Sequence, residues 1–209
     1  MAQVHSTDDS TAGRLVLASQ SPRRMELLKF LGLQFDIIPS TIDEKSDLKD
    51  PAEFVRTLAV EKATDVIAQL KSKQAGRSLV LGADTIVVLN NEILGKPTSR
   101  EDAYQMLMRM SGRCHRVFTG VTLIDTHSGA IETRHETSNV YFRSLDPTEV
   151  RCYVKTNEPM DKAGSYALQG TASAFVEKIE GCYTNIIGLP IPLTVKMLRA
   201  VGYPVLGLP

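Results

Sequence analysis

Residues 79–89 form the sequence Leu-Val-Leu-Gly-Ala-Asp-Thr-Ile-Val-Val-Leu, a nearly continuous apolar run. Its aliphatic and β-branched content predicts two buried strands, Ser78–Ala83 and Ile86–Leu89, interrupted at Asp84-Thr85 and followed by a turn at Asn90-Asn91. A carboxylate in such a run is costly unless it is hydrogen-bonded, paired or bound to a metal. Asp84 is therefore a candidate functional residue, with capping of backbone amides in a turn as the alternative. Gly82 and Ala83 leave room for a close approach to it.

Around this run, short apolar segments alternate with segments that carry helix-start signals. Arg14–Ala18 predicts a strand, and Ser21-Pro22 opens a helix that Gly32 ends. Asp50-Pro51 opens a second helix, to about Leu70. Further strands are predicted at Phe35–Pro39, Val117–Ile124, Ile131–Arg143 (broken by polar residues) and Ala174–Ile179, and further helices after Thr98, after Asp146 and over Leu193–Ala200. The order predicts an α/β fold with a mixed, twisted central sheet flanked by helices and two lobes around a cleft.

Composition excludes several classes of protein. The 209 residues carry 24 basic and 24 acidic side chains, and this zero net charge argues against binding to nucleic acid. The apolar run is too short to span a membrane, and three cysteines without a CxxC pair fit a reducing compartment, so we expect a cytoplasmic protein. Residues 1–13 are expected to form a disordered leader and residues 14–209 a single domain.

A candidate anion site lies where the first strand meets the first helix, in Ser19-Gln20-Ser21-Pro22-Arg23-Arg24. The free amides and dipole of a helix N-terminus attract anions, and the two arginines supply guanidinium groups that match phosphate oxygens. The alternative is an ordinary capped helix with two solvated arginines, because the glycines of a Walker loop are absent.

Lys62 falls in the apolar stripe of the second predicted helix, with Val55, Ala59 and Val66. It either extends to the edge of the core or reaches a buried anion, and the first is the commoner case. Glu61 is expected at the surface. Loops contribute further charged candidates, each of which is by default a solvated side chain: Asp43, Glu44, Lys96, Asp161 and Lys162. Together with Asp84 they supply the carboxylates and lysines that metal-assisted attack on a phosphate requires.

These segments together resemble the Maf family of nucleoside triphosphate pyrophosphatases. The matching blocks follow the family order and cover most of the chain from residue 14 to about 200: LASQSPRR (17–24), Ile42-Asp43-Glu44, AVEKA (59–63), GADTIV (82–87), GKP (95–97), MSGR (110–113), EPMDKAGSYALQG (158–170) and GLP (188–190). The resemblance implies a fold like that of inosine triphosphate pyrophosphatases and hydrolysis of a nucleoside triphosphate to the monophosphate and pyrophosphate. It also implies a divalent metal, Mg²⁺ or Mn²⁺.

The resemblance assigns roles to individual positions. Asp84 matches the catalytic base, and Ser19, Arg23 and Arg24 match the phosphate-binding loop. Glu44, Lys62 and Lys96 match polar cleft residues, with Glu44 and Asp84 as the expected metal ligands. Asp161 and Lys162, in the late motif, are expected to contact substrate.

Substrate choice follows from three positions that separate the subfamilies. Here they are Arg23, Thr85 and Gln169, which resemble the group that prefers dTTP and UTP. Ala167 replaces a glycine that the family commonly has, which restricts the backbone there. The expected partners are a small-molecule nucleoside triphosphate and a second copy of the chain in a homodimer, with no nucleic acid and no membrane. The alternatives are a catalytically silent nucleotide-binding regulator of growth or septation and an inosine triphosphate-type pyrophosphatase.

Overall fold

The structure, a computed structural model, describes residues 13–44, 46–71 and 76–206. The leader expected over residues 1–13 lies, apart from Gly13, outside the described residues. Within the described ranges no helix combines the length and apolar character needed to cross a membrane.

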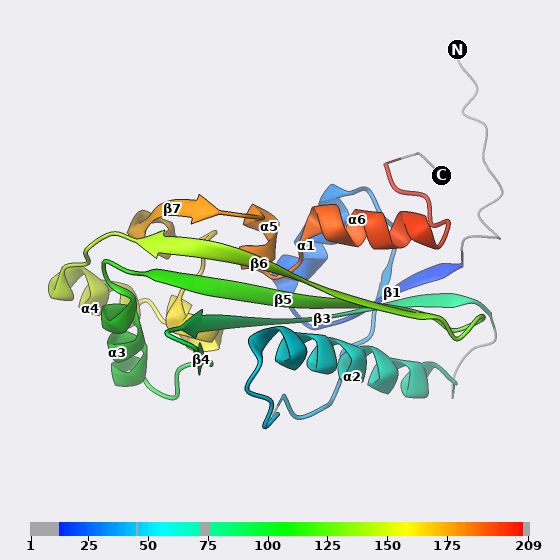
Figure 1. The fold of residues 1–209 in the computed structure, drawn as a ribbon, viewed down its shortest axis with the longest axis horizontal. Helices are drawn as coiled ribbons and strands as arrows, with labels where there is room; N and C mark the ends of the chain where they lie inside the picture. Colours follow the sequence, from blue (N-terminus) through cyan, green and yellow to red (C-terminus); the bar gives the residue numbers. More distant parts are fainter. Residues whose placement is uncertain (1–12, 45, 72–75, 207–209) are drawn as a thin grey trace, which may run out of the picture.

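Seven strands form one mixed sheet, with helices on both faces (Figure 1). The strands are β1 (Arg14–Ala18), β2 (Asp36–Ile37), β3 (Ser78–Leu89), β4 (Glu92–Leu94), β5 (Cys114–Asp125), β6 (Ile131–Phe142) and β7 (Val176–Glu180). The helices are α1 (Pro22–Phe30), α2 (Pro51–Lys71), α3 (Arg100–Met110), α4 (Pro147–Lys155), α5 (Tyr183–Ile187) and α6 (Ile191–Ala200), with short 3₁₀ turns η1 (Glu158–Asp161), η2 (Ala163–Ser165) and η3 (Thr171–Phe175). The sheet order is β2-β1-β3-β5-β6-β7, and β4 pairs with β3. The predicted α/β class with a mixed sheet is confirmed.

The break expected at Asp84-Thr85 is absent, and β3 is one strand of twelve residues. It pairs with β5 from Leu79 to Val88, with Asp84 opposite Gly120 and Thr85 opposite Thr119. The strand continues through Asp84 because the buried carboxylate has a cationic partner. The turn predicted at Asn90-Asn91 is confirmed, since both residues have positive φ and β4 returns to pair with β3.

Two other strand predictions were wrong, one in length and one in the break that it assumed. The strand expected over Phe35–Pro39 is reduced to Asp36–Ile37, which pairs only with β1 at the sheet edge. Ile131–Phe142 is unbroken despite its polar residues, because it pairs with β5 along its length and leaves much of one face half-exposed. Such one-sided solvation is ordinary for antiparallel strands.

Helix α2 lies directly against the sheet, below β3 and β5 in Figure 1. Two glycines permit this approach. A Cβ atom on Gly82 would lie 2.2 Å from the Ala59 carbonyl oxygen, and one on Gly120 would lie 2.2 Å from the Val55 carbonyl oxygen. The contact brings the Lys62 side of α2 onto the centre of β3.

The edge of β3 is open between two neighbouring strands. Its pairing with β1 ends at Gly82, and its pairing with β4 begins at Val87. Among the described residues no strand pairs with residues 83–86 on that side. One apolar cluster, with α1 and α6, lies at the β1 end of the sheet, and a second, with α3 and α4, lies at the β4 end. The cleft predicted between two lobes opens at this gap.

Candidate active site

The cleft at the open edge of β3 has a volume of about 410 Å³. Charged and hydroxyl side chains from the segment after β1, from α1, from α2 and from the loop before α2 line one part of it. Apolar side chains from β3, β5, α5 and the segment after η2 line another. Successive side chains of a strand point to opposite faces. Asp84 therefore faces α2, whereas Thr85 faces α1 and α5.

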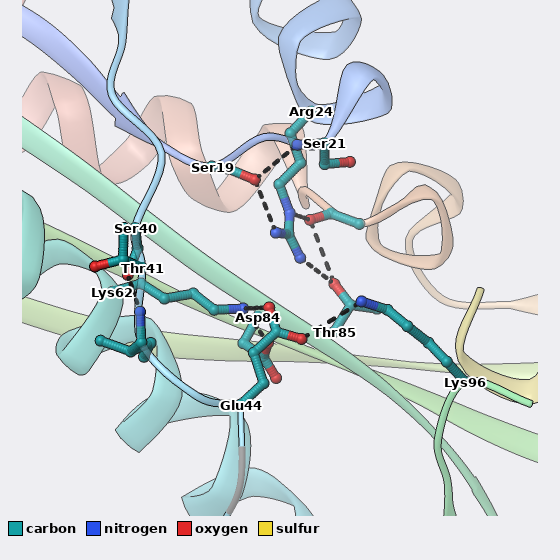
Figure 2. A network of polar contacts seen from close by, with 12 residues as sticks. Ser19, Ser21, Arg24, Ser40, Thr41, Glu44, Lys62, Asp84, Thr85 and Lys96 are labelled. Carbon is teal, nitrogen blue, oxygen red and sulfur yellow. Dashed lines mark hydrogen bonds and ion pairs between the residues drawn. The ribbon is translucent and has the colours of Figure 1, made fainter. Parts of the chain in front are cut away.

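Asp84 and Lys62 form a buried ion pair, with Lys62 Nζ 2.6 Å from Asp84 Oδ1 (Figure 2). Their side chains are 8% and 7% exposed. The same ammonium lies 2.7 Å from Glu44 Oε1. Lys62 therefore reaches a buried anion, Asp84, which decides between the two alternatives for this residue. Glu61 is exposed, as predicted.

Glu44 comes from the loop that precedes α2 and lies between two lysines. Its second oxygen, Oε2, is 3.6 Å from Lys96 Nζ, which follows β4. Partial burial opposes ionisation of Glu44, but the hydrogen bond and charge of Lys62, with the charges of Lys96 and Arg24, hold its pKa below the ordinary value. The loop is fixed to α2 by the Thr41 amide, which donates to Asp65 Oδ2 at 2.8 Å.

Arg24 is buried on the other face of the sheet and organises the predicted phosphate loop. Its Nε donates to the Gly188 carbonyl oxygen at 2.8 Å, and its terminal nitrogens donate to Ser19 Oγ at 3.2 Å and Thr85 Oγ1 at 3.0 Å. Burial lowers the pKa of Arg24, while Asp84 and Glu44 favour its charged form. Three of the five guanidinium N–H groups bind protein, which leaves two for an anion.

Arg23 lies at the mouth of the cleft, with Nη1 3.9 Å from Asp161 Oδ2 of η1. Lys162 contacts Asp161 and donates to the Glu158 carbonyl oxygen at 2.8 Å. Burial opposes ionisation of Asp161, yet Lys162 and then Arg23 lower its pKa. These charges connect the 3₁₀ segment to the start of α1 across the cleft.

The apolar part of the cleft is lined by aliphatic and aromatic side chains. Val87 and Val117, which pair in register on β3 and β5, line it together with Ile187 and Tyr166. Tyr166 is fixed by a 2.8 Å hydrogen bond between its hydroxyl and Nε2 of the buried His115. Gln169, which is exposed, lines the cleft three residues beyond Tyr166.

The two carboxylates, Asp84 and Glu44, supply the oxygen ligands that a divalent cation requires. Asp84 and Glu44 both bind the Lys62 ammonium, so their oxygens lie close together, and Mg²⁺ and Mn²⁺ prefer oxygen ligands. Over the described part of the chain there is no group of three or more acidic, histidine or cysteine side chains suited to a metal. A cation here needs further oxygens, and a triphosphate can supply them.

Eleven of the twelve side chains proposed from the sequence line this one cleft, and Asp43 is not among its lining residues. The eleven are Ser19, Arg23, Arg24, Glu44, Lys62, Asp84, Thr85, Lys96, Asp161, Lys162 and Gln169. Their individual roles stay predictions. Sequence reasoning missed His115, Thr119 and Asn185, which are buried behind the cleft. The sequence feature that could have identified such residues is a polar residue inside an apolar strand, as Thr119 is between Phe118 and Gly120.

Comparison with known proteins gives a family and a set of close relatives. A family described as Maf-like protein matches residues 14–201. A dTTP/UTP pyrophosphatase of Pelotomaculum thermopropionicum is 49% identical over 193 residues, 92% of this chain and 98% of that protein. One from Caldicellulosiruptor saccharolyticus is 47% identical over 191 residues, covering 91% of this chain and 96% of its own length. One from Clostridium tetani is 46% identical over 189 residues, covering 90% and 97%.

Among solved structures, a nucleoside-triphosphatase, dITP/XTP pyrophosphatase, from Mycobacterium abscessus matches with a TM-score of 0.33 and 10% sequence identity. The match covers 62% of this chain and 72% of that one. The expected likeness to inosine triphosphate pyrophosphatases therefore stays a prediction.

Proposed function

The chain belongs to the Maf family, and from this membership and the chemistry of the cleft we propose that it is a nucleoside triphosphate pyrophosphatase. It hydrolyses the triphosphate to a monophosphate and pyrophosphate, with dTTP and UTP as preferred substrates. The curated relatives named as dTTP/UTP pyrophosphatases, at 46–49% identity over about nine-tenths of the chain, support this choice.

One observation carries the proposal: the ion pair of Asp84 and Lys62 lies at the open edge of β3, in the same cleft as an apolar surface. A nucleotide presents these two chemistries at its two ends. The triphosphate requires cations and hydrogen-bond donors, and the base requires a flat apolar surface with a few polar groups. The cleft provides both within about 410 Å³.

In the proposed reaction Asp84 accepts a proton from the attacking water. The water oxygen bonds to the α-phosphorus as the bond from that phosphorus to the bridging oxygen breaks, and pyrophosphate leaves. Oδ1 of Asp84 binds Lys62, and Oδ2 has no hydrogen-bond partner among the described side chains, so it is the oxygen that meets the water. The contact with Lys62 holds the Asp84 carboxylate in place for this step.

The cations around the cleft offset the charge of the triphosphate and of the leaving group. Lys62 and Lys96 lie near Asp84 and Glu44, and Arg23 and Arg24 lie in the first turn of α1. Hydrogen bonds to protein groups fix Lys62 and Arg24 before substrate binds, whereas ion pairs at 3.6 Å and 3.9 Å hold Lys96 and Arg23. Little reorganisation is therefore needed as charge moves onto pyrophosphate. Glu44 keeps both lysines directed toward the same point.

We also propose that a divalent cation takes part, with Glu44 and Asp84 as the residues that would bind it. When bound, Mg²⁺ or Mn²⁺ neutralises charge on phosphate oxygens and polarises the phosphorus for attack.

The test is a nucleotide panel with the full chain, measuring monophosphate and pyrophosphate by chromatography, with Mg²⁺, with Mn²⁺ and with chelator. We expect UTP and dTTP to be cleaved first and chelator to stop turnover. Asp84→Asn should lower kcat by about 10²–10⁴-fold while the circular dichroism spectrum is unchanged.

Three outcomes would change the proposal. Faster cleavage of ITP or GTP than of UTP would favour an inosine triphosphate-type enzyme. Tight nucleotide binding without pyrophosphate release would indicate a silent regulator. Turnover that persists in chelator would refute the role of the divalent cation and leave the proposed hydrolysis standing. The cytoplasmic location and the homodimer stay predictions, which fractionation and light scattering can test.

A further inference from the structure

A chain of hydrogen bonds runs from the cleft into the core on the α1 and α5 side of the sheet. Arg24 Nη2 donates to Thr85 Oγ1 at 3.0 Å, and Thr85 Oγ1 lies 3.0 Å from Thr119 Oγ1. Thr119 Oγ1 lies 2.9 Å from the carbonyl oxygen of Asn185 in α5. Thr85 lines the cleft, whereas Thr119 is fully buried behind it.

Counting donors fixes the direction of this chain. A hydroxyl has one hydrogen and two acceptor sites. The Asn185 carbonyl can only accept, so the hydrogen of Thr119 points to it and Thr119 Oγ1 accepts from Thr85. The one competing arrangement sends the Thr85 hydrogen to the Gly188 carbonyl oxygen at 3.4 Å, which is longer and weaker.

In the favoured arrangement the Thr85 hydrogen points to the buried Thr119 and away from the cleft. One lone pair of Thr85 Oγ1 accepts from Arg24. In the favoured arrangement the other lone pair is left for a ligand. Thr85 therefore offers the cleft an acceptor and no donor.

We propose that Thr119 is a specificity-determining positioning residue, which fixes the Thr85 hydroxyl as an acceptor and thereby selects bases with an N–H at N3. The inference rests on the proposed function and deepens it. Uracil and thymine have one donor on their pairing edge, N3–H, whereas cytosine has an acceptor at N3. Two opposed acceptors repel, so CTP is disfavoured at this contact.

Thr119 explains discrimination between uracil and cytosine, which Gln169 alone does not explain. The amide of Gln169 contains both a donor and an acceptor and can turn to suit either base. It is exposed, and its side chain has no hydrogen bond to the described part of the chain. The Thr85 hydroxyl cannot turn without losing its hydrogen bond to Thr119 Oγ1, which has no other donor among the described residues.

The test is the ratio of kcat/KM for UTP to that for CTP in Thr119→Val and Thr119→Ser. Valine keeps the volume but removes the acceptor, so the ratio should fall roughly fivefold, the size of one ordinary hydrogen bond. Serine keeps the hydroxyl and should restore the ratio to within about twofold of the starting protein.

A matched control is Thr122→Val. Thr122 is also fully buried on β5, but its hydroxyl pairs with Thr133 Oγ1 at 2.7 Å, away from Thr85. This variant should leave the ratio unchanged. If Thr119→Val lowers both rates equally and keeps the ratio, Thr119 is only structural and the proposal is wrong.

Calorimetric dissociation constants for UMP and CMP, measured on the same variants, separate this proposal from the proposed function. A protein that releases no pyrophosphate, yet loses its preference for UMP in Thr119→Val, would refute hydrolysis and support the hydroxyl direction. Equal affinity for UMP and CMP in the starting protein would refute the hydroxyl direction, whatever the turnover.

Discussion

Lys62 Nζ lies 2.6 Å from Asp84 Oδ1, and both side chains are more than nine-tenths buried. Such a pair contributes little net stability, because desolvation of two charges offsets their attraction, but removal of one partner alone is costly. The second contact of Lys62, at 2.7 Å from the half-exposed Glu44, links the loop before α2 to the same point. The buried pair thus provides a charged site inside an otherwise apolar sheet.

Lys62→Met should therefore destabilise the protein and also impair catalysis. The variant leaves the Asp84 carboxylate buried without its cation, so we expect the free energy of unfolding at pH 7 to fall by about 3 kcal/mol. Loss of a cation beside the triphosphate should lower kcat by about 10²–10³-fold. Urea denaturation and single-turnover kinetics measure the two effects.

The double variant Lys62→Met with Asp84→Asn is the control. It removes both charges, so it should regain at least half of the lost stability and none of the lost activity. If the double variant instead loses as much stability as the two single variants together, the two side chains are not coupled, which would contradict the 2.6 Å contact.

The partner of Asp84 explains why part of the site could be predicted and part of the fold could not. An acidic residue in an apolar run pointed to the cleft in which Asp84 lies, because burial of a charge needs a partner. The same residue misled the strand prediction, since local sequence gives no sign that Lys62, twenty-two positions earlier, neutralises it. The fold class could be predicted from the alternation of strands and helices. The open edge of β3 could not, because it depends on where β1 and β4 pair with β3 in the assembled sheet.

Gly82→Ala should separate α2 from the sheet. Its Cβ atom would lie 2.2 Å from the backbone oxygen of Ala59, which cannot move without shifting the helix that carries Lys62. We expect a loss of about 1–3 kcal/mol from overpacking and a fall in kcat as Lys62 leaves Asp84. Gly95→Ala is a stability control, since nothing lies within 4 Å of the added atom. Equal thermal midpoints for the two variants would show that α2 does not need the glycine.

His115 should make the protein less stable as the pH falls below neutrality. Its side chain is 1% exposed, and burial lowers its pKa from 6.5 to about 4. Between these values the unfolded chain binds a proton that the folded chain does not, so stability is greatest above pH 6.5 and declines toward pH 4. The full cost of this one group is on the order of 3 kcal/mol. Burial raises the pKa of its partner Tyr166, which therefore stays protonated over this range.

His115→Gln tests this dependence, because glutamine can still bond to the Tyr166 hydroxyl but does not titrate. Urea denaturation at pH 7.5 and pH 5 should show a smaller loss of stability on acidification in the variant than in the starting protein. If the two proteins lose the same amount, the acid sensitivity comes from carboxylates such as Glu44, whose pKa is also lowered.

The residues behind the cleft were beyond sequence reasoning for a physical reason. His115, Thr119 and Asn185 act through partners that are distant in the chain, at separations of 51, 34 and 68 residues. Their identity as polar side chains in buried elements was visible, but their partners depend on how α5 and η2 pack on β5. Motif residues at the ends of strands and helices were easier to find, because local capping and charge signals mark them.

Gln169→Glu should lower turnover of UTP and dTTP more than it lowers turnover of CTP. The amide supplies a donor for O4 of uracil or thymine, and a carboxylate has acceptors only. The 4-amino group of cytosine can still donate to that carboxylate, so CTP loses less. We expect kcat/KM for UTP to fall by about tenfold, so that the differences between UTP or dTTP, CTP and purines become smaller in the variant.

Because Gln169 is exposed, its replacement should leave the thermal midpoint within about 1 °C of the starting protein. Parallel losses for UTP and CTP would place Gln169 on the sugar or phosphates and leave base choice to Thr85 and its partner Thr119.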